Sequence, residues 1–100
     1  MKLKSGVKVR GASNELLLGL YIASSVWSAL GQRLVVTSMA DGKHSHASLH
    51  YSGNAADLRT RYFDDNGAEA AVWLKDALSD EYDVVVESDH IHLEFQPKGL

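Results

Sequence analysis

Apolar residues recur at three- and four-residue spacing in two stretches of the chain, and this spacing predicts two amphipathic helices. The first begins at an N-cap, Ser13 or Asn14, and ends before Gly31, which stands where a glycine commonly terminates a helix. The second covers Ala70 to Leu78 and follows a turn at Asp64 to Gly67. Two such helices need a further layer that covers their apolar faces.

Short runs rich in β-branched residues supply that layer, because they predict strands. Within one run Ala56 and Leu58 point to one side and Ala55 and Asp57 to the other, since side chains alternate along a strand. The predicted strands are a short edge strand at 5–10 and then 33–37, 54–60, 82–87 and 90–95. We therefore expect an α+β fold, a single small domain over residues 1–100 with a mostly antiparallel sheet packed on two helices.

Composition narrows the classes of protein that fit this chain. Hydrophobic residues make up 45% and charged residues 23%, as in folded proteins, and the net charge of −3 provides no basic field for nucleic acid. The most apolar stretch, Leu16 to Leu30, is too short and too polar to span a bilayer or to serve as a signal peptide. With no cysteine, disulfides and cysteine-ligated zinc are excluded. We expect no nucleic-acid partner and no membrane insertion.

All five histidines lie in two short windows, 44–50 and 90–92. In the last predicted strand His90, His92 and Glu94 alternate with apolar residues, so these polar residues belong to the face of the sheet away from the helices, here called the open face. Two histidines at this spacing on one strand face suit metal binding or acid–base chemistry. The ordinary alternative is a solvated sheet face.

Asp57 interrupts an otherwise apolar strand, where a carboxylate needs a partner. A salt bridge to Arg59 or Arg61 is one explanation, and a metal ion is the other. His50 precedes Asp57 by seven residues, Gly53 lets the chain turn into the strand, and one histidine of the last strand adds a third ligand. Such nitrogen and oxygen ligands bind zinc, and three of them leave a fourth position for water, as in catalytic sites. The sequence thus predicts a Zn²⁺ cofactor on the open face.

Two segments resemble the motifs of a known family. Residues Ser48 to Leu58 resemble the S-x-H-x-x-G-x-A-x-D-[IL] motif of zinc D-Ala-D-Ala metallopeptidases, and His90-Ile91-His92 resembles the His-x-His that completes their site. Residues Asp41 to Gly53, with Glu87-Ser88 and the same histidine pair later, are also similar to the signalling domain of hedgehog proteins, which shares this peptidase fold. The likeness covers about residues 33–96 and implies the same fold for this chain.

The resemblance implies a role for each matching residue. His50, Asp57 and His92 would bind zinc, because the second histidine of the His-x-His pair is the ligand in this family. His90 and His44 would stand beside the metal and stabilise the oxyanion of the reaction. The zinc site would then combine residues from three separate parts of the chain.

Two acids compete for the role of general base. Asp89 stands three residues before His92, which is the spacing found in many peptidases of the family. Glu87 resembles the glutamate of hedgehog-type domains, and in a two-residue hairpin it lies opposite His90, on the face of His92. The direction of the Asp89 side chain, which occupies the turn, does not follow from the sequence.

The resemblance implies a zinc metallopeptidase that acts on peptidoglycan stem peptides, as a D-Ala-D-Ala carboxypeptidase or an endopeptidase. The chain departs from the family because it lacks the S-G-x-R arginine that helps to hold substrate, with Lys43 as one substitute, and because only Asp41 remains of the hedgehog calcium ligands. A small chain without signal peptide or anchoring module suits a phage or bacterial protein that reaches the cell wall after release or delivery. The alternatives are a non-catalytic hedgehog-like zinc domain used for binding and a metal-free structural domain.

Overall fold

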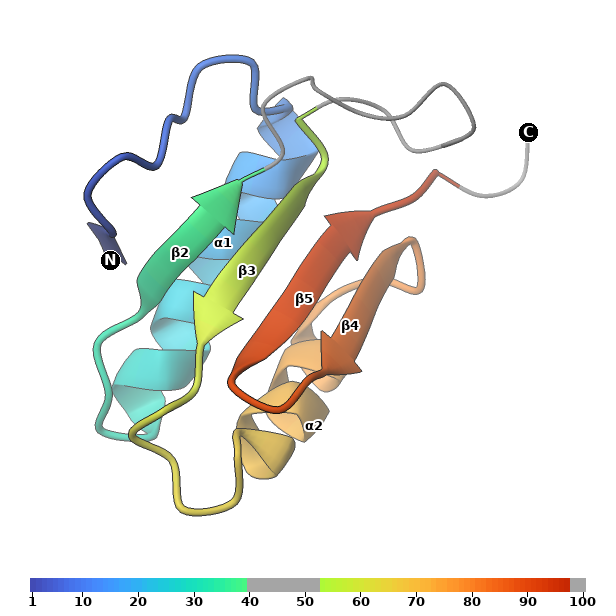
Figure 1. Cartoon of the computed structure of the whole chain (residues 1–100). Coiled ribbons are helices and arrows are strands. Elements are labelled where there is room, and N and C mark those ends of the chain that lie inside the picture. Colours follow the sequence, from blue (N-terminus) through green and yellow to red (C-terminus); the bar gives the residue numbers. More distant parts are fainter. Residues whose placement is uncertain (40–52, 98–100) are drawn as a thin grey trace.

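Two helices cover one face of a five-stranded sheet in the structure, a computed structural model that describes residues 1–39 and 53–97 (Figure 1). The helices are α1 (Asn14–Ala29) and α2 (Ala68–Ala77), and the strands are β1 (Lys2–Leu3), β2 (Val35–Met39), β3 (Ala55–Arg59), β4 (Tyr82–Val86) and β5 (His90–Phe95). The strand order is β1-β2-β3-β5-β4, and every neighbouring pair is antiparallel except β1 and β2. The prediction of an α+β domain with a mostly antiparallel sheet and two helices is therefore confirmed.

Helix α1 begins and ends where the sequence pattern predicts. The Ser13 side chain accepts a hydrogen bond from the Leu16 backbone N–H at 3.0 Å, which satisfies one of the free amides of the first turn. Gly31 adopts the left-handed conformation just after the helix, at φ 80°. On the buried side the Trp27 indole N–H donates to the Arg59 carbonyl of β3 at 3.4 Å, so the helix is tied to the middle of the sheet.

The first strand differs from its prediction. The expected edge strand at 5–10 is wrong, because the strand that forms is Lys2–Leu3, which pairs in parallel with β2. Gly6 and Gly11 both adopt positive φ, 91° and 87°, and such residues turn the chain out of the extended conformation. The alternation of two valines between these glycines therefore does not make a strand.

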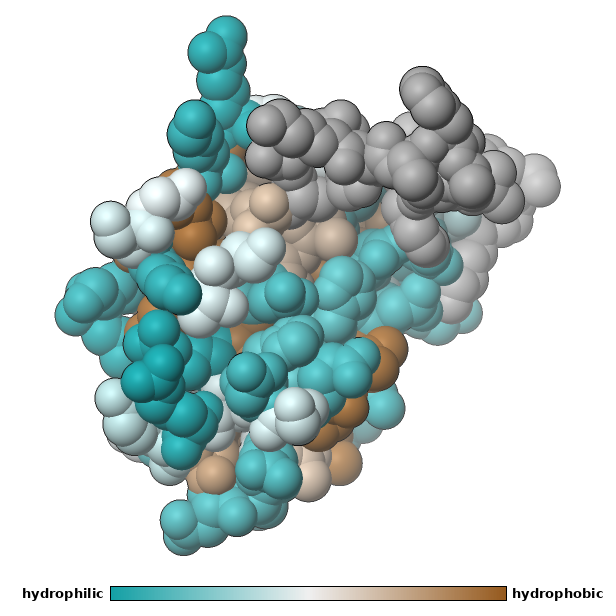
Figure 2. Space-filling view, viewed as in Figure 1, coloured by the Kyte–Doolittle hydropathy of each residue, from teal (hydrophilic) through white to brown (hydrophobic). Residues whose placement is uncertain are grey.

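The sheet has an apolar face against the helices and a polar open face. Ala56 and Leu58 of β3, with Ile91 and Leu93 of β5, are at most 2% exposed and face the helices, which confirms the predicted orientation of both strands. The residues between them belong to the open face, which Figure 2 shows to be largely hydrophilic. The other fully buried core side chains are Leu16, Leu20, Ala23, Trp27, Leu34, Val36, Ala70, Ala71 and Leu74.

Helix α2 begins two residues before the predicted Ala70, because the preceding turn also supplies its cap. The two carboxylate oxygens of Asp65 accept hydrogen bonds from the backbone N–H groups of Gly67 and Glu69, each at 2.9 Å. Gly67 adopts φ 87°, which a residue with a side chain rarely tolerates. The turn predicted at 64–67 is thus present and sets the start of the helix.

Candidate metal and catalytic site

The pairing of β3 with β5 brings three of the candidate side chains together on the open face. Asp57 pairs directly with His92 in the antiparallel register, and Arg59 pairs with His90. The Asp57 Oδ1 atom lies 3.0 Å from His92 Nδ1 and 3.6 Å from His90 Nε2. Each of the three side chains is about one third exposed. Two imidazole nitrogens therefore lie around one carboxylate oxygen, in the middle strands of the sheet.

Other expectations for these residues have different outcomes. The candidate ligand His50 and the candidate oxyanion residue His44 lie outside the described residues. The alternative of a salt bridge from Asp57 to Arg59 or Arg61 is wrong for residues 1–39 and 53–97, where the ion pairs of Asp57 run to the two histidines. The physical reason is the register, which places a histidine rather than an arginine opposite the carboxylate.

A β-bulge in β2 lies next to Asp57. The register shifts between Val36, which pairs with Leu58, and Ser38, which pairs with Asp57, so that Thr37 is the extra residue. The Thr37 hydroxyl donates to the backbone carbonyl of Asp57 at 3.4 Å. Bulges occur often beside active sites because they redirect side chains, and this one contacts the backbone that carries the carboxylate.

Carboxylates face both ring nitrogens of His92. Besides Asp57 at Nδ1, the Oε1 atom of Glu94 lies 2.9 Å from His92 Nε2. The hydrogen bond to Asp57 is the main cause that raises the pKa of His92 from 6.5 to about 9, while partial burial opposes the rise and Glu94 adds to it. Without a bound metal, His92 is thus an imidazolium at neutral pH and donates one hydrogen bond to each carboxylate.

Asp89 extends the cluster beyond His90. Its Oδ1 atom lies 2.7 Å from His90 Nδ1, while the other nitrogen of that ring faces Asp57. The hydrogen bond from His90 lowers the pKa of Asp89, whose exposed carboxylate is therefore ionised at neutral pH. The direction of the Asp89 side chain did not follow from the sequence. In the structure this side chain contacts the ring of His90 on the side away from Asp57, as an orienting carboxylate does in hydrolytic sites.

Glu87 takes the hairpin position expected of it. Its backbone N–H donates to the His90 carbonyl at 2.8 Å, which confirms the two-residue loop Ser88-Asp89. Strand alternation assigns its side chain to the face of His92, and that side chain is exposed. Both candidate bases therefore flank His90, since Asp89 contacts its ring and Glu87 its backbone.

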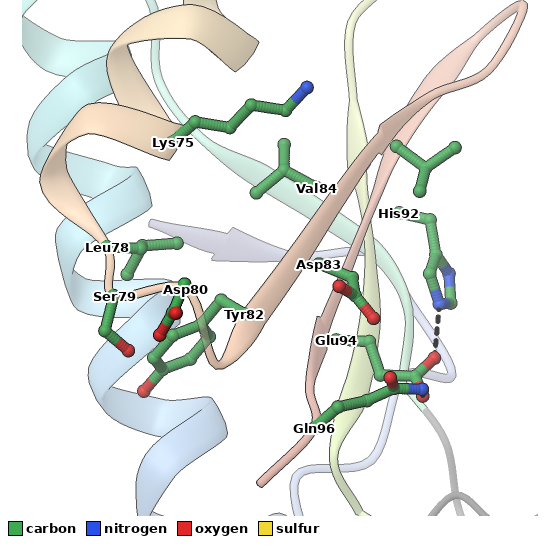
Figure 3. A pocket seen from close by; sticks show the side chains of 11 residues that line it. Lys75, Leu78, Ser79, Asp80, Tyr82, Asp83, Val84, His92, Glu94 and Gln96 are labelled. Carbon is green, nitrogen blue, oxygen red and sulfur yellow. Dashed lines mark hydrogen bonds and ion pairs between the residues drawn. The ribbon is translucent and has the colours of Figure 1, made fainter. Parts of the chain in front are cut away.

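Glu94 also lies in this site. The alternation of polar and apolar residues along β5 had predicted only that its side chain belongs to the open face. Glu94 is 7% exposed, and the Gln96 side-chain amide donates to its Oε2 atom at 3.0 Å. Figure 3 shows the link from His92 to Glu94, with Gln96 beside the carboxylate. An acid two residues after a candidate metal histidine, on the same strand face, is the signal by which such a partner can be found.

Among the residues that the structure describes, two cavities border the cluster. One of about 720 Å³ runs along the edge strand β4 and reaches His92 and Glu94 (Figure 3). The other, of about 260 Å³, lies beside His90 and has three cationic side chains in its wall. Its lining residues are Lys4, Thr37, Arg59, Arg61, Asp89 and His90. This cationic cavity could not be predicted from the sequence pattern, because Lys4 comes from a distant part of the chain.

The donor atoms of the cluster match those that zinc takes. Two ligand atoms on one tetrahedral zinc ion lie roughly 3.3 Å apart, given metal–ligand distances of about 2.0–2.1 Å, and Asp57 Oδ1 and His92 Nδ1 are 3.0 Å apart. Within residues 1–39 and 53–97, no three His, Cys, Asp or Glu side chains are arranged to hold a metal ion. The described residues thus supply two of the three expected ligands, and His50 lies outside them.

Comparisons with protein families and with curated proteins do not assign a function to this site. No protein-family model matches the chain, and no curated protein matches it. No helix in the part of the chain that the structure describes has the length and apolar character needed to cross a membrane. The contacts on the open face and the motif likeness are therefore the basis for the proposed function.

Proposed function

We propose that this protein is a zinc-dependent peptidase that cleaves peptidoglycan stem peptides, as a D-Ala-D-Ala carboxypeptidase or an endopeptidase. The observation that carries the proposal is the cross-strand pair of Asp57 and His92, whose facing oxygen and nitrogen lie 3.0 Å apart on the open face. The motif likeness assigns the same two residues to zinc, together with His50. The sheet register and the sequence motif are separate observations, so their agreement supports one site.

The residues around the proposed zinc ion have complementary tasks. His50, Asp57 and His92 would hold the ion, which lowers the pKa of water toward ~7 and polarises a carbonyl group. Asp89 or Glu87 would accept a proton from the attacking water and pass it to the leaving amine. Asp89 is the base that we favour, because it stands three residues before the proposed ligand His92 and contacts the ring that faces Asp57.

His90 and His44 would bind the oxyanion that develops on the scissile carbonyl. The described contacts support this role for His90, since Asp89 holds one nitrogen of its ring and the other lies 3.6 Å from Asp57 Oδ1. A ring held in this way keeps its direction when substrate binds. Its Nε2 atom would donate to the oxyanion when both ring nitrogens carry a proton, and such preorganised donors contribute to catalysis without a cost of reorientation.

The larger cavity has room for a peptide, and the smaller one has the positive charge that suits anionic groups of a substrate. The larger one, of about 720 Å³, falls in the usual range of ligand sites and runs along β4 to His92. The smaller one places Lys4, Arg59 and Arg61 beside His90, where they would bind a carboxylate of the stem peptide in place of the missing S-G-x-R arginine. The protein would meet this substrate at the cell wall after release or delivery by another protein.

A non-catalytic zinc domain used for binding is the second candidate, and the hedgehog-like stretch from Asp41 to Gly53 favours it. The two candidates differ in what they require of the acids beside His90. A peptidase needs Asp89 or Glu87 for proton transfer, whereas a binding domain needs neither.

Mass spectrometry of purified muropeptides incubated with the protein tests the proposal, together with elemental analysis of the metal. We expect about one zinc ion per chain and loss of terminal D-Ala or an internal cut. The double variant Asp57→Ala, His92→Ala should lack both zinc and product, and Asp76→Ala, which removes an exposed acid from α2, should keep both. Unchanged metal content in the double variant refutes the ligand assignment, and zinc without product favours the binding domain.

A further inference from the structure

Glu94 is a buried acid on a face that is otherwise open to water. Only 7% of the residue is exposed, whereas Asp57, His90 and His92 on the same face have side chains that are about one third exposed. A carboxylate out of water is costly unless it is paired and hydrogen-bonded. Its two oxygens are held by His92 Nε2 at 2.9 Å and by the Gln96 amide at 3.0 Å.

The two ring nitrogens of His92 contact different carboxylates and therefore have different roles. Nε2 faces Glu94, and Nδ1 faces Asp57, the other proposed zinc ligand in the described residues. When Nε2 keeps its proton and donates it to Glu94, the lone pair of the neutral ring is on Nδ1 and points toward Asp57. The carboxylate thereby selects the nitrogen that is free to bind a metal.

We propose that Glu94 is a positioning residue of the zinc site, which holds His92 with Nδ1 directed toward Asp57 and Nε2–H donated to its own carboxylate. This inference rests on the proposed function, because it requires that His92 binds zinc. A carboxylate behind a metal-bound histidine fixes the tautomer and the ring orientation and makes the ligating nitrogen a better donor. Removal of such a partner typically weakens metal binding by about 10- to 100-fold.

A packing role alone does not account for the choice of residue. A pair of apolar side chains in place of Glu94 and His92 would fill the same space without the cost of desolvating charges, and such double replacements are often neutral or stabilising. The carboxylate is instead placed where both of its oxygens accept hydrogen bonds, one of them from the candidate ligand. The carboxylate group of Glu94 therefore acts on the site through its hydrogen bond to His92.

The first experiment measures zinc affinity by competition with a chromophoric chelator. The variants are Glu94→Ala, Glu94→Gln and, as a control, Glu69→Ala, which removes an exposed glutamate from α2. Glu94→Ala should bind zinc about 10- to 100-fold more weakly than the wild-type chain. Glu94→Gln, whose amide oxygen still accepts a hydrogen bond without the negative charge, should retain part of the affinity, and Glu69→Ala should match the wild type. Thermal unfolding of each metal-free variant shows that it is folded.

The second experiment observes the imidazole itself by ¹⁵N NMR of histidine-labelled protein saturated with zinc. The wild-type ring should show a slowly exchanging Nε2 proton on His92 and a metal-bound Nδ1. In Glu94→Ala the Nε2 proton should exchange faster, although zinc is saturating. A residue that acted only through packing would change stability and leave this signal as it is.

The outcomes separate this inference from the function on which it rests. Equal zinc affinities and equal Nε2–H exchange in the wild type and both Glu94 variants overturn the positioning role and leave the zinc site standing. A wild-type chain that binds no zinc overturns the zinc site and the positioning role together. If Glu94→Ala does not fold, the affinity and the NMR signal of Glu94→Gln decide the question alone.

Discussion

The neighbours of His92 strongly constrain the chemistry of its imidazole ring. Asp57 and Glu94 hold both nitrogens of its ring and raise its pKa to about 9, whereas a histidine on a solvated strand would keep its ordinary value. Under the proposed function, protons and the zinc ion therefore compete for the Nδ1 atom of this ring. Under the proposed function, zinc binding at neutral pH displaces a proton from His92.

We expect the metal-free protein to lose stability between pH 6.5 and about 9. The pKa of His92 is raised above its unfolded value, so its contribution to the free energy of unfolding is complete below pH 6.5 and is lost as the pH rises through about 9. Urea unfolding in the presence of a chelator, repeated across this pH range, measures the slope. His92→Gln, which lacks the titrating group, should give a flatter profile, and an equally steep one would contradict the assignment to His92.

We also predict that Asp89 is the general base of the proposed reaction. Asp89→Asn keeps the shape of the side chain but removes proton transfer, which is typically worth ~10²–10⁴-fold in rate. We expect this variant to retain zinc and to lose most of its turnover of a peptide substrate, because Asp89 stands at a short offset from the proposed ligand His92 and contacts His90. Glu87→Gln should lose much less. Steady-state rates and metal content of the two variants provide the comparison.

The reverse pattern of rates would move the role of base to Glu87, whose backbone pairs with His90. Full activity in both single variants would leave the proposed reaction without a base, and the peptidase mechanism would then have to be abandoned. The zinc content serves as the control, since a variant that loses its metal says nothing about proton transfer.

At the scale of single elements, strands β3 and β5 were the most predictable part of the molecule. An acid within an apolar strand and a strict alternation of histidines with apolar residues both indicate one buried and one open face, and a two-residue hairpin fixes a register. The structure confirms these features. The bulge at Thr37 and the burial of Glu94 could not be predicted in this way, because they depend on which strand lies alongside.

The entry into β3 gives a prediction of its own, since Gly53 has no room for a side chain. Its φ is 85°, and a Cβ atom there would overlap the Gly11 carbonyl oxygen. The left-handed conformation costs a residue with a side chain about 1–2 kcal/mol, and overpacking adds typically 1–3 kcal/mol. Gly53→Ala should therefore lower the free energy of unfolding by roughly 2–5 kcal/mol, as measured in urea.

Gly31 offers a matched control for this substitution. It has a similar φ of 80°, but a Cβ atom built on it meets nothing within 4 Å. Gly31→Ala should therefore show only the conformational cost of about 1–2 kcal/mol. Equal losses in the two variants would mean that the chain at Gly11 moves away from the added Cβ atom without measurable cost.

At the scale of the whole molecule, a chain of 100 residues has a small core, so the proposed zinc ion would contribute a large share of its stability. A ligand that binds only the folded state stabilises it by roughly 4 kcal/mol at a thousandfold excess over Kd. Under the proposed function, removal of zinc with a chelator should lower the melting temperature by more than about 10 °C, because 1 kcal/mol shifts it by about 4–8 °C in domains of this size.

The melt of Asp57→Ala serves as the control, because a chain that has lost a zinc ligand should not respond to the chelator. An unchanged melt of the wild-type chain, with the metal shown to be gone, would mean that the site does not stabilise the fold. Circular dichroism with elemental analysis of the same samples provides both readings.

Fold class was predictable from local pattern, whereas the assembly of the sheet was not. Periodicity indicates helices and strands, but the parallel pairing of β1 with β2 and the cationic cavity at Lys4, Arg59 and Arg61 depend on contacts between distant parts of the chain. The same limit applies to the site. The motif likeness selected Asp57 and His92 as partners, and only the fold reveals that a second carboxylate, Glu94, contacts the other nitrogen of the histidine.

The alternation along β3 and β5 also bears on how this protein can change over evolutionary time. Leu58 and Ile91 support the fold from one side of the sheet, while Asp57 and His92 lie on the other, where the proposed chemistry would take place. Substitutions on the open face leave the packed side intact, so one scaffold can exchange its polar groups without being rebuilt. The same separation makes these two strands a suitable starting point for engineering metal sites into a very small protein.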